Sequence, residues 1–480
     1  MRFFAFGEII TMNILIVGNG FDLSHYLPTK YDHFMDVMGA IEKKNLGKPI
    51  QNVFSNPVNT LPELILKVLE IKRAVDEKTY QMDFDTLFST CRDKKFIDQT
   101  KEIYDISSID FSLETIVKFQ YELKNNCWYQ YFKNHVEEIK TWIDFEQKIQ
   151  DVLTILAECI GELEQIHNPK KIYEYFSEHT KDGSLGIKEK NSKILNFFNF
   201  TAEEEYDRQS INLGRPSYKS TRVNLNPRFC HGESLLNNFS PSLFLDFLSN
   251  QLDDFIEIFN LYLELVINQL IPVNKFSIES KGEISLDKIY SFNYTNTYQR
   301  IYESVDVEYL HGSHGKEQNI VLGIDELKDE CLKKLKAYGF TKYHQKLFKD
   351  TDYLFLDSFK SKLKSFEKDL ESFDKAYGHN PPEIYQHQLK QHFNLNLNFY
   401  IWGHSLDVSD KYYILDLFSL NDEIDRNVRV IVYYFDKNAK FALLNNLLAI
   451  LEKDKVEQWM KNKWLKFKPN PEIKFTEAIL

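Results

Sequence analysis

The segment from Asn13 to Val17 is a compact apolar run that ends in Gly18-Asn19-Gly20, and it constrains the fold more than any other part of the chain. A short apolar run that ends in glycine predicts a buried strand followed by a tight turn and a helix. A second helix should follow Pro28, with Thr29 as its N-cap because Asp32 stands three residues later. A strand, a glycine turn and a helix in this order are typical of nucleotide-binding α/β domains.

Strand signals return only after residue 285, in five short apolar runs. They are Ile289–Phe292, Val307–Leu310, Ile320–Leu322, Asn398–Trp402 and Val428–Tyr434. The spacing of apolar residues in 439–451 predicts a helix that covers the sheet after the last strand. Strands that alternate with helices predict an α/β fold with a doubly wound, Rossmann-like parallel sheet. We therefore assign residues 12–45 and 285–480 to a Rossmann-like nucleotide-binding domain.

Two long segments with helical spacing interrupt this domain. Residues 60–280 form a predicted helical insertion domain, in which Leu64, Val68 and Ile71 illustrate the spacing, and a Lys-rich helical insertion covers about 326–394. Inside the first insertion, residues 181–232 have weak periodicity and more Gly, Ser, Asn and Arg, which predicts a long loop or a mobile arm. The chain has 480 residues, more than one hydrophobic core usually supports, so large insertions are expected.

Charge and cysteine content limit the partners and the compartment. A net charge of −12 disfavours binding to nucleic acid or to an anionic membrane surface. The five cysteines are scattered and form no CxxC pair, which argues against a disulfide framework or a zinc ribbon and fits a reducing cytoplasm. No apolar run approaches the roughly 18 residues that a membrane span needs. We expect a cytoplasmic protein without membrane contacts.

Polar or glycine-rich segments follow several predicted strands, where open parallel sheets bind their ligands. They are residues 18–22, 291–296, 311–313 and 403–407. The first suits a phosphate, since glycines let backbone N–H groups and a helix N-terminus approach an anion. However, Leu23 replaces the third glycine of a dehydrogenase fingerprint, and Asp22 would repel an adjacent phosphate. A plain tight turn, with Asp22 as a helix cap, is the structural alternative.

Asn293 and His311 are the candidate catalytic residues. The amide of Asn293 can both donate to and accept from a ribose or an amide, and His311 can act as a general base near neutral pH. Their structural alternatives are a turn asparagine and a core histidine. His311 and His314 lack the nearby cysteine or suitably spaced carboxylate of a metal site, so we expect no metal. Ser405 is no hydrolase nucleophile of the α/β-hydrolase type, because no histidine follows His404.

The segment Trp142-Ile143-Asp144-Phe145-Glu146 contains two carboxylates at positions i and i+2. On a helix these two side chains point to different sides, so they do not form an acidic pair. Asp144 as an N-cap, with Gln147 three residues later, explains the segment without a functional role.

Taken in chain order, these motifs resemble the AbiH-type bacteriophage abortive infection family. The resemblance rests on residues 14–23 and 27–31, then 142–146, 291–295, His311-Gly312, and 403–406 with Asp410. It implies a role in phage exclusion, with a phage-derived or host protein as activator. A second copy of the chain, in a homo-oligomer, is a further partner to expect.

The same order of motifs is similar, more distantly, to sirtuin-like NAD-hydrolysing domains of anti-phage systems. This resemblance implies NAD as substrate or ligand, with Asn293 and His311 as catalytic residues. The residues that it places at the nucleotide are Gly18, Asn19, Gly20, Phe21, Asp22, Gly403 and Ser405. Asp22 replaces a serine of those domains, and Thr295 replaces an aspartate. The resulting hypothesis is an NAD hydrolase (NAD glycohydrolase), with a catalytically silent nucleotide sensor as the alternative and a nuclease disfavoured by the acidic charge.

Overall fold

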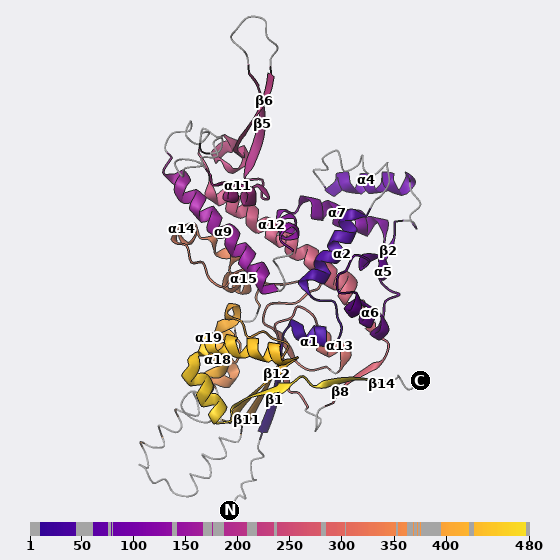
Figure 1. Cartoon of the computed structure of the whole chain (residues 1–480), viewed down its shortest axis with the longest axis vertical. Helices are drawn as coiled ribbons and strands as arrows, with labels where there is room; N and C mark the ends of the chain where they lie inside the picture. The colour runs from indigo at the N-terminus through magenta and orange to yellow at the C-terminus, as the bar shows by residue number, and fades with distance from the viewer. Residues whose placement is uncertain are drawn as a thin grey trace, which may run out of the picture.

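The computed structural model divides the chain between a sheet and a larger helical unit (Figure 1). It describes residues 10–44, 61–136, 142–166, 187–208, 218–279, 285–361 and 395–476, with short gaps at 75–77, 79, 235–237, 303, 352–353 and 422–426. Residues 175, 368, 372 and 375 are also described. Parts of the predicted insertions, including 209–217 and 376–394, lie outside these ranges.

A parallel sheet of six strands forms the smaller part. Its strands are β1 (Ile10–Val17), β9 (Lys288–Ser291), β10 (Val307–Tyr309), β11 (Leu395–Trp402), β12 (Val428–Tyr434) and β13 (Leu465–Pro469). They lie in the order β10-β9-β1-β11-β12-β13. Counted along the chain this is 3-2-1-4-5-6, the order of doubly wound dinucleotide-binding sheets. The order reverses between β1 and β11, so a crevice is expected where these two strands end.

The alternation of side chains along β1 explains why both faces of this sheet are covered. Ile14 and Ile16 lie in a core that also contains buried residues of α18 (Lys411–Phe418) and α19 (Lys437–Lys461). Leu15 and Val17 point to the other face and pack with Phe21 of α1 (Asn19–Ser24) and Tyr298 of α13 (Thr297–Ile301). An apolar run without polar gaps is what a parallel strand buried on both faces requires, so the predicted α/β class is confirmed.

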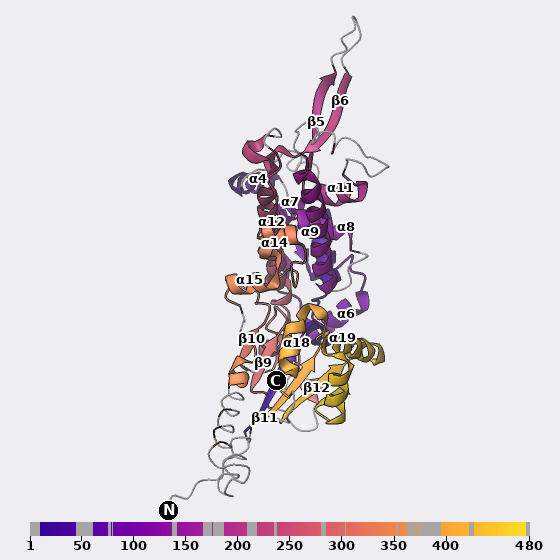
Figure 2. The same ribbon diagram turned by 90° about the vertical axis from the view of Figure 1, so that its left-hand side faces the viewer.

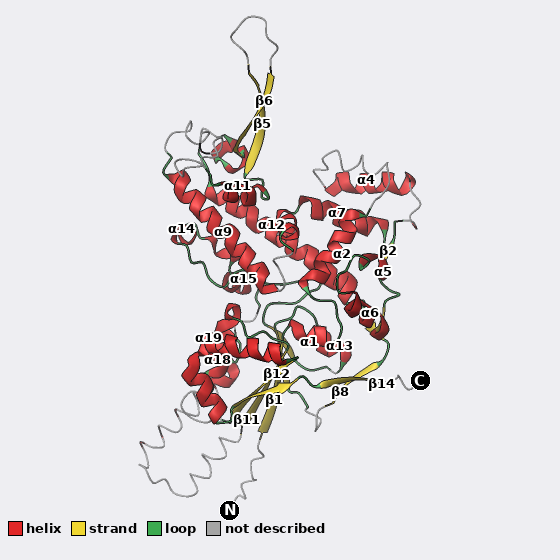
Figure 3. Cartoon of the chain, viewed as in Figure 1, coloured by secondary structure: helices red, strands yellow, loops and turns green. Residues whose placement is uncertain are grey.

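The helical unit has its own core, which is rich in aromatic residues. Its helices are α2 (Tyr31–Lys43), α4 (Leu61–Ala74), α5 (Phe84–Leu87), α6 (Lys94–Ile103), α7 (Leu113–Asn125), α8 (Cys127–Asn134), α9 (Trp142–Glu164), α11 (Glu189–Asn196) and α12 (Pro241–Tyr262). Phe34 of α2 packs against Phe255 and Phe259 of α12 at ring-centroid distances of 5.8 and 5.3 Å. Helix α2 therefore packs into the helical unit, although it follows β1 and α1 directly in the chain (Figure 3).

Residues 181–232, predicted as a long loop or a mobile arm, contain regular secondary structure in their described part. They include α11 and an antiparallel hairpin of β5 (Thr201–Arg208) and β6 (Tyr218–Leu225), with Thr201 opposite Leu225. The hairpin extends away from the helices in both views (Figure 2). Its sequence is mostly charged and polar, and an exposed two-stranded ribbon needs no apolar alternation, so the hydrophobic pattern missed it.

Other strands lie outside the six-stranded sheet in the described residues. The pairs are β2 (Met82–Asp83) with β4 (Asp110–Phe111), β3 (Tyr104–Asp105) with β7 (Ile271–Pro272), and β8 (Lys275–Glu279) with β14 (Glu472–Thr476). The hydrophobic pattern also fails to predict β13, because its alternating lysines make the segment look polar. The predicted strand Ile320–Leu322 is wrong: this segment is buried but irregular, and its Leu322 N–H donates to the side chain of Gln345.

Two predicted helix caps are also wrong. Lys30, rather than Thr29, is the N-cap of α2, and the hydroxyl of Thr29 instead donates to Asn19 Oδ1 at 2.7 Å. Asp144 lies in the first turn of α9, which already begins at Trp142. Two further short helices, α14 (Glu330–Lys334) and α15 (Lys342–Phe348), follow the third strand of the sheet in the chain, and α14 packs against α9. No helix in the described ranges is long and apolar enough to span a bilayer.

Candidate functional site

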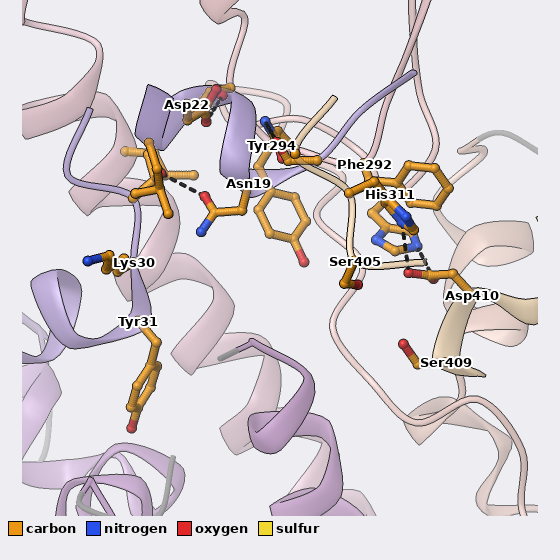
Figure 4. A pocket seen from close by; sticks show the side chains of 18 of the residues that line it. Asn19, Asp22, Lys30, Tyr31, Phe292, Tyr294, His311, Ser405, Ser409 and Asp410 are labelled. Atoms are coloured by element: carbon orange, nitrogen blue, oxygen red, sulfur yellow. Dashed lines mark hydrogen bonds and ion pairs between the residues drawn. The ribbon is translucent and has the colours of Figure 1, made fainter. Parts of the chain in front are cut away.

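A pocket of about 380 Å³ lies where β1, β9 and β11 end and the helical unit begins. His311 and Asp410 point toward one another at one end of it, and Lys30 and Tyr31 lie at the other (Figure 4). Its walls also include Gly18, Asn19, Asp22, Glu146, Asn293, Tyr294, Thr295, Lys342, Gly403, His404 and Ser405. The structure thus brings to one cavity most of the site residues that the sequence singled out, from segments hundreds of residues apart.

The glycine turn after β1 is packed against the loop after β11. The N–H of Gly18 donates to Trp402 O at 3.1 Å, and the N–H of Gly20 donates to Gly403 O at 2.9 Å. Gly403 has φ +74°, and a Cβ there would lie 2.1 Å from Phe21 N, so only glycine fits. Gly20 and Phe21 do not line the pocket, and the N–H groups of Gly18 and Gly20 are already used. These glycines allow the close packing of the two loops, and the phosphate-binding role of the turn stays a prediction.

The Asn293 side chain is fixed by one end and open at the other. Its Nδ2 donates to Gly18 O at 3.0 Å, and its backbone is tied to Ser291 Oγ. Since only the NH₂ group can donate to a carbonyl, this contact also fixes the orientation of the amide. No donor of the described residues reaches Oδ1, which leaves an acceptor at the pocket from a residue that is only 6% exposed.

Asp22 is buried at the pocket wall with half of its carboxylate unpartnered. Thr295 donates to Oδ2 at 2.6 Å, while Oδ1 has no partner among the described residues. Burial raises the pKa of Asp22 to about 6, although hydrogen bonds from Thr295, Thr297 and Asn293 oppose this rise. Asp22 is therefore no helix cap: it lies in the first turn of α1, whose N-cap is Gly18.

Replacing Asp22 with asparagine should stabilise the protein above pH 6. The unfolded carboxyl ionises near pH 4 but the folded one only near pH 6, so stability falls as pH rises between these values. Above pH 6 this costs on the order of 2–3 kcal/mol, part of which the neutral amide recovers. We expect a gain of about 1–2 kcal/mol in urea denaturation at pH 8 and a smaller gain at pH 5.

Asp83→Asn is the matched control for this experiment. Asp83 accepts from Thr86 as the N-cap of α5, and these hydrogen bonds lower its pKa, so its amide variant should show no gain at pH 8. A less stable Asp22→Asn protein at pH 8 would mean that the carboxylate has a stabilising partner.

Asp410 links two histidines at the far end of the pocket. His311 Nε2 lies 3.1 Å from Oδ1, and His404 Nε2 lies 3.3 Å from Oδ2. The backbone N–H of Leu406 donates to His404 Nδ1 at 2.9 Å, so the proton of neutral His404 is on Nε2, facing the carboxylate. Burial lowers the pKa of His311 to about 3 even though Asp410 opposes this shift. His311 is a neutral ring near pH 7 and a weak proton acceptor.

Lys342 joins this cluster to the helical unit. Its Nζ lies 2.8 Å from Glu146 Oε1 and 3.4 Å from Asp410 Oδ1, and the residue is 5% exposed. Burial alone would raise the pKa of Asp410, but Lys342 and the two histidines outweigh it and hold that pKa well below its usual value. Burial raises the pKa of Glu146 to about 7 against the opposing charge of Lys342. One ammonium thus faces two carboxylates, which gives the cluster excess negative charge.

Sequence reasoning missed Glu146 and Lys342 as site residues. Glu146 belonged to a recognised motif but was explained away with Asp144, and Lys342 follows no predicted strand and belongs to no motif. Asp410 belongs only to the family pattern, whereas His404 belongs to that pattern and to the polar segment 403–407 after a predicted strand. In the described part of the chain, no group of three or more His, Cys, Asp or Glu residues is arranged to hold a metal ion.

The fold and the pocket together define an α/β protein with a doubly wound parallel sheet and a polar site at its switch point. The family model for bacteriophage abortive infection AbiH matches residues 14–434. This match covers most of the chain, which therefore belongs to the AbiH family. No curated protein and no solved structure is significantly similar to the chain.

Proposed function

We propose that this AbiH protein is an abortive-infection effector that binds NAD or a related nucleotide in the pocket and hydrolyses its N-glycosidic bond. The observation that carries the proposal is the convergence of Asn293, His311 and Asp410 on a cavity at the switch point of a 3-2-1-4-5-6 sheet. The resemblance of the same motifs to sirtuin-like NAD-hydrolysing domains supports it.

The charges of the pocket suit the proposed reaction. When the bond between ribose C1′ and the nicotinamide nitrogen breaks, its electron pair neutralises the pyridinium ring and positive charge moves to the ribose. A cluster with excess negative charge, formed by Glu146, Asp410 and the single ammonium of Lys342, stabilises such a cation. The open Oδ1 of Asn293 is suited to accept from the attacking water or a ribose hydroxyl.

The size of the pocket decides which end of the nucleotide it holds. At about 380 Å³ it is near the lower limit of ligand pockets, which fits a nucleoside better than a whole dinucleotide. We therefore assign it to the nicotinamide ribose, with His311 as a neutral hydrogen-bonding group rather than the base. Ser405, which is exposed at the pocket, and Asn19 would contact the remainder of the molecule.

The test is incubation of the purified protein with NAD, with and without lysate of phage-infected cells as a source of activator. We expect nicotinamide and ADP-ribose in equal amounts, at least with the activating lysate. Binding of NAD without any turnover would support a nucleotide sensor that passes a signal to a partner. If the folded protein neither bound nor cleaved NAD, the nucleotide would be removed from the proposal. Light scattering of the same samples tests the expected homo-oligomer.

A further inference from the structure

The tryptophan-containing segment 142–146 places Glu146 in the wall of the pocket. Phe145 is fully buried and packs against Phe132, Phe255 and Tyr31, with ring centroids 3.6, 5.1 and 5.6 Å apart. These contacts fix the first turn of α9 in the core of the helical unit. The next residue, Glu146, consequently has a fixed position in the pocket wall.

The carboxylate of Glu146 is held on one side and open on the other. Lys342 Nζ lies 2.8 Å from Oε1, and the side chain of Glu146 is 15% exposed. Within the described residues Lys342 is its one hydrogen-bonding or ion-pair partner, so Oε2 remains available to a molecule in the cavity. Lys342 also contacts Asp410, which keeps the two carboxylates apart on either side of one ammonium.

The hydrolysis of an N-glycosidic bond needs a group that accepts a proton from water, and Asp22, Glu146 and His311 are the candidates in the pocket wall. Asp22 is unsuitable because its unpartnered Oδ1 is fully buried and its Oδ2 already accepts from Thr295. His311 is unsuitable because burial lowers its pKa to about 3. Burial raises the pKa of Glu146 to about 7, with Lys342 opposing the shift and Asp410 and Asp407 adding to it. Tyr294 also faces this carboxylate, but its own pKa is raised above 10, so it stays neutral. A base that titrates near the working pH accepts a proton most effectively.

We propose that Glu146 is the general base of the pocket and that Lys342 is the residue that positions it. As the bond from C1′ to the nicotinamide nitrogen breaks, the water oxygen bonds to C1′ and one water proton passes to Glu146 Oε2. The nicotinamide nitrogen keeps the electron pair of the broken bond, so the atoms and charges balance without a further reactant. The inference rests on the proposed hydrolysis of NAD.

Glu146→Gln tests the inference, because glutamine keeps the shape of the side chain but accepts no proton. We expect kcat to fall on the order of 10²-fold and KM to change little. The parent rate should fall as pH drops through about 7, since the protonated carboxyl cannot act as a base, and this limb should vanish in the variant. Asp144→Asn, two residues earlier on the same helix, is the matched control and should keep the parent profile.

Azide separates a base from a residue that merely shapes the pocket. Azide attacks C1′ as an anion and needs no proton acceptor, so it should restore turnover of Glu146→Ala and yield an azido sugar product. An unchanged kcat in Glu146→Gln, or no restoration by azide, would overturn the role of Glu146 while leaving NAD hydrolysis intact. A parent protein that never turns over NAD would overturn both proposals together.

Discussion

Replacing Lys342 with methionine should lower the free energy of unfolding by about 3–5 kcal/mol at pH 7.5. The side chain is buried, and its ammonium lies within 3.4 Å of Asp410 and 2.8 Å of Glu146. Methionine fills a similar volume but leaves a buried carboxylate without its cation, and this uncompensated charge dominates the loss. Protonation of Glu146 removes part of this uncompensated charge, because the pKa of this residue is already about 7.

The pH dependence of this loss has a definite sign. The pKa of Asp410 is depressed in the folded protein, so its contribution is present above the unfolded value near 4 and is lost as pH falls below it. The pKa of Lys342 is raised, so its contribution persists through neutral pH and is lost only under strongly alkaline conditions. The difference between parent and variant should therefore persist down to about pH 4 and shrink only below it in urea denaturation.

Lys333→Met is the matched control for the same measurement. Lys333 belongs to the same segment and pairs with Glu330 at 2.9 Å, but both side chains are exposed. Surface pairs of this kind contribute about 0–1 kcal/mol, so this variant should unfold almost like the parent. Equal losses in the two lysine variants would mean that the Lys342 cluster is solvated in solution.

The parts of the fold that sequence predicts are those with a local signal. β1 and the strand before Gly403 are apolar runs that end in a glycine. Such runs predict strands of a parallel sheet that are buried on both faces. Their neighbour relation in the sheet has no local signal, because β1 and β11 are separated by hundreds of residues. The charged β5–β6 hairpin could not be predicted from hydrophobic periodicity, because its backbone pairing does not depend on an apolar face.

The residues of the site also divide into those with a local sequence signal and those without one. Asn293 and His311 follow predicted strands, so the rule for open parallel sheets was sufficient to bring them together. Asp144 and Glu146, at positions i and i+2, do point to different sides of α9. Glu146 therefore lines the pocket without Asp144, while Phe145 between them packs in the core of the helical unit. Lys342 can be identified as a site residue only from the structure, because its buried partners Glu146 and Asp410 come from two other parts of the chain.

Asn293→Ala should reduce kcat/KM for NAD cleavage by about 10²–10⁴-fold and change stability little. The alanine removes the Oδ1 acceptor that we assign to water or ribose, so the reacting groups lose their alignment. It also removes the hydrogen bond from Nδ2 to Gly18 O, but that carbonyl still accepts from Phe21 N at 2.8 Å. The free energy of unfolding should therefore fall by only about 0.5–1.5 kcal/mol.

Asn398→Ala provides the comparison that isolates the role of the pocket. Asn398 lies in the same sheet, and its Nδ2 donates to Asn13 Oδ1 at 3.0 Å, so the variant loses a similar hydrogen bond between neighbouring strands. Asn398 does not line the pocket, and its variant should melt like Asn293→Ala but cleave NAD like the parent. If both asparagine variants lost activity in proportion to stability, Asn293 would be a structural residue of the β1 turn. A fully active Asn293→Ala protein that still bound NAD would exclude the alignment of water or ribose by its Oδ1.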